Sequence, residues 1–270
     1  AMVTGGSAGL GQFIAQTFLN RGYRVMIVGR DPQRINRAIG ELTAEDAIDG
    51  TIIGQVADVT RSDQISELVS RLERDFGRLD VLVNCVGQSD RGLLEHLDGE
   101  RLDRLLLLNV HTALLCSQAS LPLLESSGGV IVNIGSLASK VGARYIGGYA
   151  IAKHALAGMT QQMRLELKPR GVHVALVSPG PIRRSDAGVR YQQQVDNSLP
   201  AQASKPGGGT RLKGLDPQRV ADAVFQCVRR RQPDVILPRY MRCLIAVGHA
   251  LPRLGDWLLI KFTSARPEDD

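Results

Sequence analysis

Aromatic side chains are scarce in this 270-residue chain, where phenylalanine, tyrosine and tryptophan together make up 4%. This scarcity argues against a surface that stacks the bases of single-stranded nucleic acid. No run reaches the roughly 18 apolar residues that a membrane-spanning helix needs. No signal peptide is visible either, although the chain opens inside an expected strand, so this absence carries little weight. These shortages favour a cytoplasmic protein.

Cysteine is also sparse, and its four copies lie far apart in the sequence, at Cys85, Cys116, Cys227 and Cys243. No two of them form a C-x-x-C pair, and none stands in a Cys/His cluster. Neither a zinc site nor a disulfide framework is therefore indicated. We expect free thiols in a reducing compartment, and no metal.

The charge is unbalanced, with a net charge of +6 and a sequence pI of about 9.4. An excess of basic residues is compatible with an acidic partner, an anionic cofactor, an anionic membrane surface or simply a basic soluble surface. Nucleic-acid binding is the weaker interpretation, because aromatics are few and no reading-helix motif is present.

Alternating short apolar runs and helix-like periods dominate the rest of the chain, and hydrophobic residues make up 43% of it. The expected strands are 1–3, 24–28, 51–56, 79–83, 130–134, 172–177 and 235–237. The expected helices are about 13–19, 32–42, 62–76, 102–124, 149–167 and 217–231. Strict alternation is typical of βαβ units, and continuous apolar strands are expected where helices cover both sheet faces.

This pattern predicts an α/β fold: a Rossmann-like, doubly wound parallel sheet in a three-layer αβα arrangement, as a single domain over 1–238. The polar stretch 183–215 is expected to be a loop over the substrate, and 239–270 a C-terminal extension. Ligands of such folds bind at the carboxyl ends of the strands. The segments that directly follow expected strands are Gly5–Gly11, Asp58, Asn84–Gly87, Ser136 and Pro179–Gly180.

A glycine turn follows the first strand and opens the first helix, with glycines at Gly5, Gly9 and Gly11. Missing side chains let a backbone approach a pyrophosphate, and the helix N-terminus attracts its charge. Ser7 offers a hydroxyl in the same turn. A dinucleotide is therefore the expected ligand of this segment.

The end of the second strand distinguishes the two nicotinamide cofactors. NAD binding commonly uses an acidic residue there, but this chain has Arg30, whose guanidinium can pair with a 2′-phosphate,. We therefore expect NADP, with NAD as the alternative and a merely solvated arginine as the plainer interpretation. Asp58, after the third strand, could reach an adenine amino group or cap a turn.

Tyr149 and Lys153 lie four residues apart and therefore share one face of the expected helix 149–167,. A positive charge beside a phenol favours the phenolate and lowers the pKa of the phenol from about 10. Such a tyrosine can exchange a proton near neutral pH. Tyr-x-x-x-Lys is common on ordinary helices, but the glycine turn and the upstream Ser136 make a catalytic pair the stronger interpretation.

These residues stand in the order and spacing of a known family: the turn Thr4–Gly11, then Asn109, Ser136, Tyr149 and Lys153. Over residues 1–237 the chain resembles the short-chain dehydrogenases/reductases, in the branch of about 250 residues. The resemblance implies that Tyr149 is the general acid in reduction and that Lys153 holds the nicotinamide ribose. It also implies that Ser136 bonds the substrate oxygen and that Asn109 holds a water in a proton relay.

The expected cofactor-binding set combines the residues above with those that the resemblance implies. It comprises Thr4, Gly5, Ser7, Gly9, Leu10, Gly11, Arg30, Asp58, Val59, Asn84, Gly87, Tyr149, Lys153, Pro179, Gly180 and Ile182. Two departures from the family stand out. Its usual Asn-Asn-Ala-Gly reads Asn84-Cys85-Val86-Gly87, and Arg184-Ser185 stand where a threonine often contacts the nicotinamide amide.

The resemblance implies an NADP(H)-dependent oxidoreductase that interconverts a ketone and a secondary alcohol, as a homodimer or homotetramer. The long tail, with apolar clusters between Arg and Lys residues, suggests a lipid-like substrate and peripheral membrane contact, or else packing on its own domain or a partner subunit. The alternatives are a non-catalytic, cofactor-sensing regulator and a sugar-nucleotide epimerase. Epimerases are usually longer and space their glycine turn differently.

Overall fold

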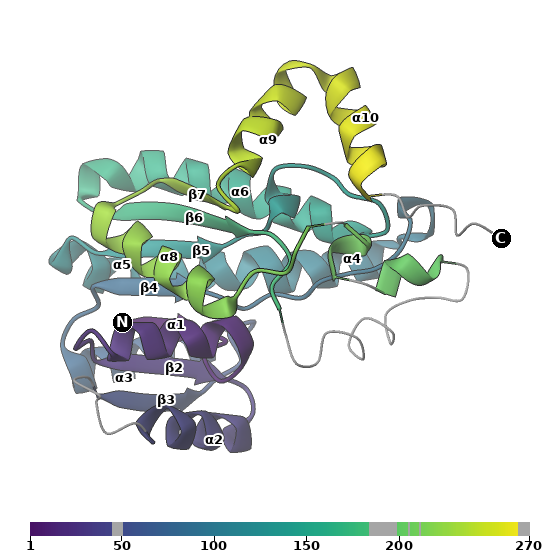
Figure 1. The fold of residues 1–270 in the computed structure, drawn as a ribbon. Coiled ribbons are helices and arrows are strands. Elements are labelled where there is room, and N and C mark those ends of the chain that lie inside the picture. The colour runs from purple at the N-terminus through teal and green to yellow at the C-terminus, as the bar shows by residue number, and fades with distance from the viewer. Residues whose placement is uncertain (45–50, 184–198, 205, 211, 264–270) are drawn as a thin grey trace.

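The computed structural model describes residues 1–44, 51–183, 199–204, 206–210 and 212–263. A seven-stranded sheet runs through the centre, and each neighbouring pair of its strands is parallel (Figure 1). In spatial order the strands are β3 (Ile52–Val56), β2 (Val25–Gly29), β1 (Met2–Thr4), β4 (Val81–Asn84), β5 (Val130–Ile134), β6 (His173–Pro179) and β7 (Asp234–Leu237). The predicted doubly wound parallel sheet is confirmed.

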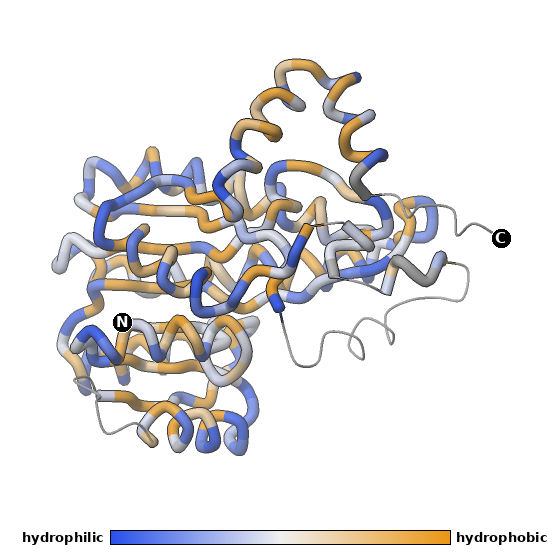
Figure 2. The backbone as a smooth tube through the Cα atoms, viewed as in Figure 1, coloured by the Kyte–Doolittle hydropathy of each residue, from blue (hydrophilic) through white to orange (hydrophobic). Residues whose placement is uncertain are grey.

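Helices cover both faces of the sheet because its strands are apolar on both sides, as the orange strands of Figure 2 show. Met2 and Val3 are both fully buried, yet they belong to opposite core layers. One layer holds α1 (Gly9–Leu19), α2 (Pro32–Thr43) and α8 (Pro217–Arg230). The other holds α3 (Ser62–Phe76), α5 (Thr112–Ser127) and α6 (Gly148–Leu167).

Local signals in the sequence explain where several helices begin and end. Asp31 caps α2 by accepting hydrogen bonds from the next two available backbone N–H groups, and Pro32 fills the first turn,. Asp216 and Pro217 start α8 in the same way. Gly77 ends α3 in the left-handed conformation, with φ of 71°,.

The expected helix 102–124 is in fact three consecutive elements. α4 (Gly99–Leu106) leads into a π-helical turn at Leu107–His111, which is followed by α5. The span Gly99–Ser127 is long and apolar enough to cross a membrane by length and composition. It contacts α3, α6 and β4, however, and so is integrated into the folded domain.

The tail forms two helices, α9 (Met241–Ala250) and α10 (Pro252–Thr263), which pack as a hairpin that stands away from the sheet (Figure 1). The helices approach closely at two glycines. A Cβ on Gly255 would lie 2.8 Å from the Cα of Gly248. Long hydrophobic stretches run along both helices (Figure 2).

Residues 184–198, 205 and 211 of the expected substrate loop 183–215 lie outside the described residues. Arg184-Ser185 are among them, and the acidic end of the chain also lies outside. Its two ends are described and lie side by side. The backbone N–H of Arg183 donates to the carbonyl of Leu215 (2.8 Å), and the N–H of Leu215 donates to the carbonyl of Pro181 (2.7 Å). The segment therefore leaves and rejoins the fold at one place.

Candidate active site

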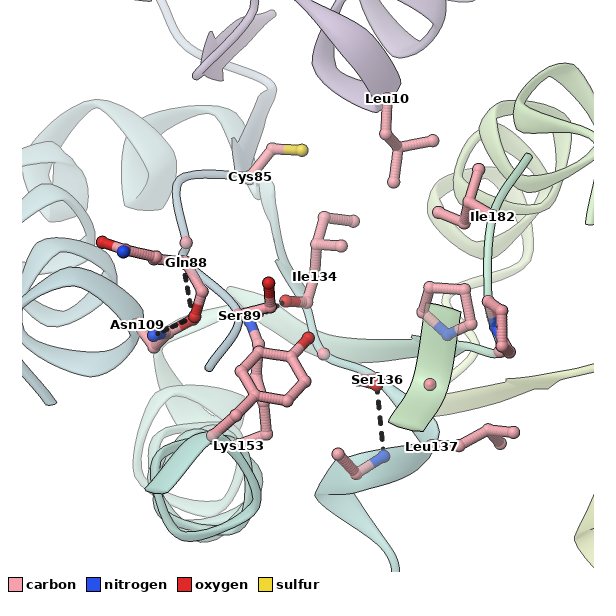
Figure 3. A pocket seen from close by; sticks show the side chains of 18 of the residues that line it. Leu10, Cys85, Gln88, Ser89, Asn109, Ile134, Ser136, Leu137, Lys153 and Ile182 are labelled. Atoms are coloured by element: carbon pink, nitrogen blue, oxygen red, sulfur yellow. Dashed lines mark hydrogen bonds between the residues drawn. The ribbon is translucent and has the colours of Figure 1, made fainter. Parts of the chain in front are cut away.

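A cleft with a volume of about 2250 Å³ runs along the carboxyl edge of the sheet. Segments far apart in the sequence meet there, as βαβ topology predicts. Most of the predicted site residues line it: Gly5, Ser7, Gly9, Leu10, Gly11, Arg30, Asp58, Val59, Gly87, Asn109, Ser136, Tyr149, Lys153, Pro179, Gly180 and Ile182. Figure 3 shows side chains from several of these segments around one space.

The glycine turn has the shape of an anion cradle. Gly5 and Gly9 adopt positive φ of 66° and 55°, which side chains disfavour,. A Cβ on Gly11 would collide with the carbonyl oxygen of Gly5. Helix α1 begins at Gly9, and the first N–H groups of a helix have no internal hydrogen-bond partner,. These residues fit a dinucleotide pyrophosphate.

Three arginines line the cleft beyond β2: the predicted Arg30, and also Arg34 and Arg37 on α2. Arg34 pairs with the cap residue Asp31 at 3.3 Å. Sequence reasoning missed Arg34 and Arg37. Arg34 and Arg37 lie three residues apart on the expected helix 32–42, and this helical spacing is the signal that could have found them as a pair on one face,. They share this end of the cleft with the carboxylates of Asp31, Glu41 and Asp58.

Asp58 lies in the same region, but its carboxylate is engaged locally. It accepts hydrogen bonds from the backbone N–H (3.0 Å) and the hydroxyl (2.8 Å) of Thr60. Burial alone would raise the pKa of Asp58, but these bonds, with the charges of Arg30 and Arg61, lower it. Asp58 therefore caps a turn, which was one of its two expected roles, at the cleft wall.

Thr4 and Asn84 are the two predicted residues that do not line the cleft. Thr4 is buried, and its hydroxyl accepts from the N–H of Cys85 (3.1 Å), fixing the chain after β4. The Asn84 amide donates to Asn133 (2.9 Å) and Ser117 (3.1 Å) inside the domain. Both residues support the cleft wall from behind.

Ser136 follows β5 and caps a short 3-10 helix, Leu137–Ser139. Its hydroxyl oxygen accepts from the N–H of Ala138 (3.2 Å), and its own N–H donates to the hydroxyl of Ser139 (3.1 Å) (Figure 3). Because a serine hydroxyl also carries a proton, Ser136 keeps a donor for a ligand oxygen in the cleft.

Asn109 lies in the π-helical turn, an irregularity frequent at functional sites. Its side-chain amide donates to the carbonyls of Gln88 (3.0 Å) and Leu105 (2.9 Å), and its oxygen accepts from the N–H of Gln88 (3.3 Å) (Figure 3). Gly87 fits against this residue, since a Cβ there would lie 2.7 Å from the amide oxygen of Asn109 and 3.3 Å from the Lys153 ammonium. Asn109 thus fixes the segment after β4 beside Lys153.

Tyr149 and Lys153 share the first turns of α6, with the ammonium nitrogen 5.7 Å from the centre of the phenol ring. Lys153 is 4% exposed and donates to the carbonyl of Ile134 (2.9 Å). Burial lowers the pKa of Lys153 to about 8, against a smaller opposing contribution from Cys85. The site therefore holds a buried cation beside a phenol.

The far wall follows β6. Gly180 is held by its N–H, which donates to the carbonyl of Leu237 (2.8 Å), and a Cβ there would approach Leu137 at 3.3 Å. Ile182 and Leu10 pack against the same apolar cluster of Leu215, Val220 and Leu237. Both side chains line the cleft (Figure 3). Among the described residues, no group of His, Cys, Asp and Glu could hold a metal ion.

A family model described as short chain dehydrogenase matches residues 1–196. Among curated proteins, the 2-(S)-hydroxypropyl-CoM dehydrogenase 3 of Xanthobacter autotrophicus is 34% identical over 224 residues, covering 83% of this chain and 86% of that protein. A "Dehydrogenase/reductase SDR family protein 7-like" of Drosophila melanogaster is 28% identical over 267 residues, covering 96% and 79%.

Two solved structures share the fold. A short-chain dehydrogenase from Streptomyces avermitilis superimposes with a TM-score of 0.76 at 23% identity, covering 96% of this chain and 94% of that one. An alcohol dehydrogenase from Thermococcus sibiricus, complexed with 5-hydroxy-NADP, gives 0.70 at 24% identity, covering 87% and 94%. At these identities the likeness concerns the fold alone.

Proposed function

The chain belongs to the short-chain dehydrogenase family, and from that premise we propose that it interconverts a ketone and a secondary alcohol with NADP(H), using Tyr149 as general acid and base. One observation supports this most. The buried ammonium nitrogen of Lys153 lies 5.7 Å from the centre of the Tyr149 ring, in the cleft that also holds the glycine cradle.

In this mechanism a bound nicotinamide supplies the hydride chemistry. The chain's own residues handle the oxygen and its proton. Tyr149 gives its proton to the carbonyl oxygen during reduction and takes it back during oxidation. Lys153 stabilises the phenolate because opposite charges attract strongly at a buried site. The hydroxyl of Ser136 donates to the same oxygen and orients it.

The test is a panel of ketones and alcohols with NADPH or NADP, followed by absorbance of the nicotinamide. Tyr149→Phe should abolish turnover while the cofactor still binds. Tyr23→Phe is the matched control, because it removes a hydroxyl far from the cleft and should leave activity intact. Turnover retained by Tyr149→Phe would refute the role of the phenol.

The preference for NADP over NAD rests on Arg30, Arg34 and Arg37 at the adenosine end of the cleft. A guanidinium pairs well with a phosphate, whereas an acidic residue in the place of Arg30 would favour NAD. Arg30→Asp should shift the ratio of kcat/KM values toward NAD. Arg229→Asp, an equal change of charge on an exposed part of α8, is the control. An unchanged ratio for Arg30→Asp would overturn the assignment.

The substrate is proposed to be hydrophobic because the hairpin contributes apolar lining to the same cleft, including Leu244, Ile245, Leu258 and Leu259. Helix α9 is tied to the segment after Ser136, since His249 Nε2 lies 2.7 Å from the carbonyl oxygen of Lys140. Each buried methylene contributes about 0.8 kcal/mol, roughly a fourfold gain in kcat/KM. A series of methyl ketones of growing chain length should show that rise, and a flat series would argue against it.

Peripheral membrane contact is proposed from the outer side of the hairpin. Its exposed residues are Val247, Leu251, Leu254, Trp257 and Ile260. With the nearby Arg253 and Lys261, this surface suits an anionic interface. Binding to anionic vesicles that is lost on Trp257→Ala, beside unchanged activity in solution, would support it. Homo-oligomerisation, the other expected association, is measured directly as the mass in solution.

The rival function is a cofactor-sensing regulator without turnover. Saturable NADPH binding with no product across the whole panel would favour that rival. The presence of both Tyr149 and Lys153 in the cleft favours the enzyme.

A further inference from the structure

The backbone that enters the catalytic helix α6 has an unusual conformation. Tyr145 has φ of 62°, in the left-handed region, and Gly147 has φ of 47° with ψ of −136°. The left-handed conformation is costly for Tyr145, whereas Gly147 adopts positive φ readily because it has no Cβ. Tyr149 stands at the second position of α6, directly after this entry segment.

No side chain of this entry segment caps α6, since the residue before the helix is Gly147. A helix leaves its first N–H groups without internal partners. Asp90, from the segment between β4 and α4, supplies the missing acceptor. Its Oδ2 accepts from the N–H of Gly148 at 3.0 Å. A carboxylate at this end also interacts favourably with the helix dipole.

The fit between the two segments is tight. A Cβ on Gly147 would collide with Oδ2 of Asp90. The N–H of Gly92 donates to the carbonyl of Tyr145 at 3.1 Å, and Gly92 forms a short parallel bridge with Ile146. The segment 90–92 therefore forms a backbone template for the strained entry to α6.

Asp90 is itself held in place. Its residue exposure is 6%, and its Oδ1 accepts from Nε (2.9 Å) and Nη2 (2.5 Å) of Arg101 on α4. The same guanidinium donates to the carbonyl of Arg91. A buried carboxylate requires such pairing to remain charged. Both oxygens of Asp90 thus have defined partners, one on α4 and one on α6.

We propose that Asp90, oriented by Arg101, is a positioning residue that fixes the start of α6 and thereby places Tyr149 for proton transfer. The inference rests on the dehydrogenase activity proposed above. Asp90 touches no reacting group in this scheme. It acts through the backbone N–H of Gly148, one residue before the phenol.

The test compares five variants, Arg101→Met among them, by kcat, cofactor affinity and amide hydrogen exchange of residues 145–155. Asp90→Ala should lower kcat about 10- to 100-fold, because a small misplacement of a catalytic group costs that much. Cofactor affinity should be unchanged, and exchange should rise in 145–155. Asp90→Asn keeps an acceptor oxygen and should therefore lower kcat less than Asp90→Ala does. If Arg101 acts through Asp90, the double variant Asp90→Ala/Arg101→Met should be no worse than Asp90→Ala alone.

Arg104→Met is the matched control, since Arg104 lies on the same helix and borders the same small pocket as Asp90. It should leave kcat and exchange as in the unmodified protein. Unchanged exchange in 145–155 for Asp90→Ala, or additive losses in the double variant, would overturn the proposal. If Asp90→Ala does not fold, Arg101→Met alone decides by the same two readouts.

The exchange measurement needs no substrate, so it separates two kinds of failure. Absence of turnover in the unmodified protein refutes the proposed function, and the positioning role with it, even where exchange shows that Asp90 anchors the helix. Normal turnover with unchanged exchange and kcat in Asp90→Ala refutes only the positioning role.

Discussion

The buried charge of Lys153 should lower the free energy of unfolding at neutral pH. Comparison with the variant Lys153→Met should measure the size of this effect. The ammonium is almost fully buried, and burial lowers its pKa from 10.5 to about 8. A shift of that size corresponds to about 3 kcal/mol of folding free energy at pH 7. Lys153→Met removes this cost, and also the hydrogen bond to Ile134, worth about 1 kcal/mol,.

The sign follows from proton uptake. Between pH 8 and 10.5 the unfolded lysine still binds a proton that the folded one has released. The stability of the unmodified protein relative to Lys153→Met therefore rises with pH across this window and is lowest below it,. The stability advantage of the variant should accordingly shrink by about 2 kcal/mol from pH 7 to pH 9.5.

Urea unfolding at the two pH values measures this difference, and the packing contribution of methionine cancels in it. Lys168→Met, at an exposed lysine just after α6, is the control and should give the same pH dependence as the unmodified protein. An advantage of Lys153→Met that stays constant with pH would refute the reasoning. It would mean that the ammonium is solvated in the folded state.

Three further predictions concern other parts of the cleft. Gly11→Ala should weaken NADPH binding at least tenfold, measured by fluorescence titration, because its Cβ collides with the Gly5 carbonyl,. Ser136→Ala should lower kcat about 100-fold through loss of an oxygen donor, with little change in cofactor affinity in the same titration. Gly255→Leu should separate α9 from α10 and lower kcat/KM for long ketones more than for acetone, since Gly248 leaves no room.

The sheet and most of its helices were predictable because their signals are local. A cap such as Asp31 determines where its own helix begins, and a short apolar run identifies its own strand,. The division of helix 102–124 by a π-helical turn was not predictable, since apolar periodicity continues through Leu107–His111 without a break. The two tail helices were missed because the apolar clusters were interpreted only by what they could contact, a membrane interface, the domain itself or a partner subunit, and not by their helical period.

The cleft was predictable in outline because most of the predicted residues follow a strand, and parallel strands bring their carboxyl ends together. What the sequence could not give was the direction of each side chain. Asn84 is the last residue of β4 and Gly87 lies three residues further on, yet the Asn84 amide points inward to Asn133 while Gly87 lines the cleft. The hydrogen-bond acceptor of the Gly148 N–H was equally unpredictable from the sequence, because Asp90 lies 58 residues upstream and no spacing rule connects the two residues.

The helix that carries Tyr149 and Lys153 is fixed by polar bonds at three positions along its length. Asp90 caps its start, the Lys153 ammonium bonds the end of β5, and Thr160 accepts from the amide of Asn133 at 2.9 Å. Apolar packing would stabilise α6 at lower desolvation cost, since buried polar groups gain little net free energy. Directional hydrogen bonds, however, fix how far the helix is rotated about its axis and shifted along it. Apolar packing tolerates small rotations and shifts of this kind. A site that needs a phenol placed to within a fraction of an ångström therefore has a physical reason to keep buried polar residues that weaken the fold.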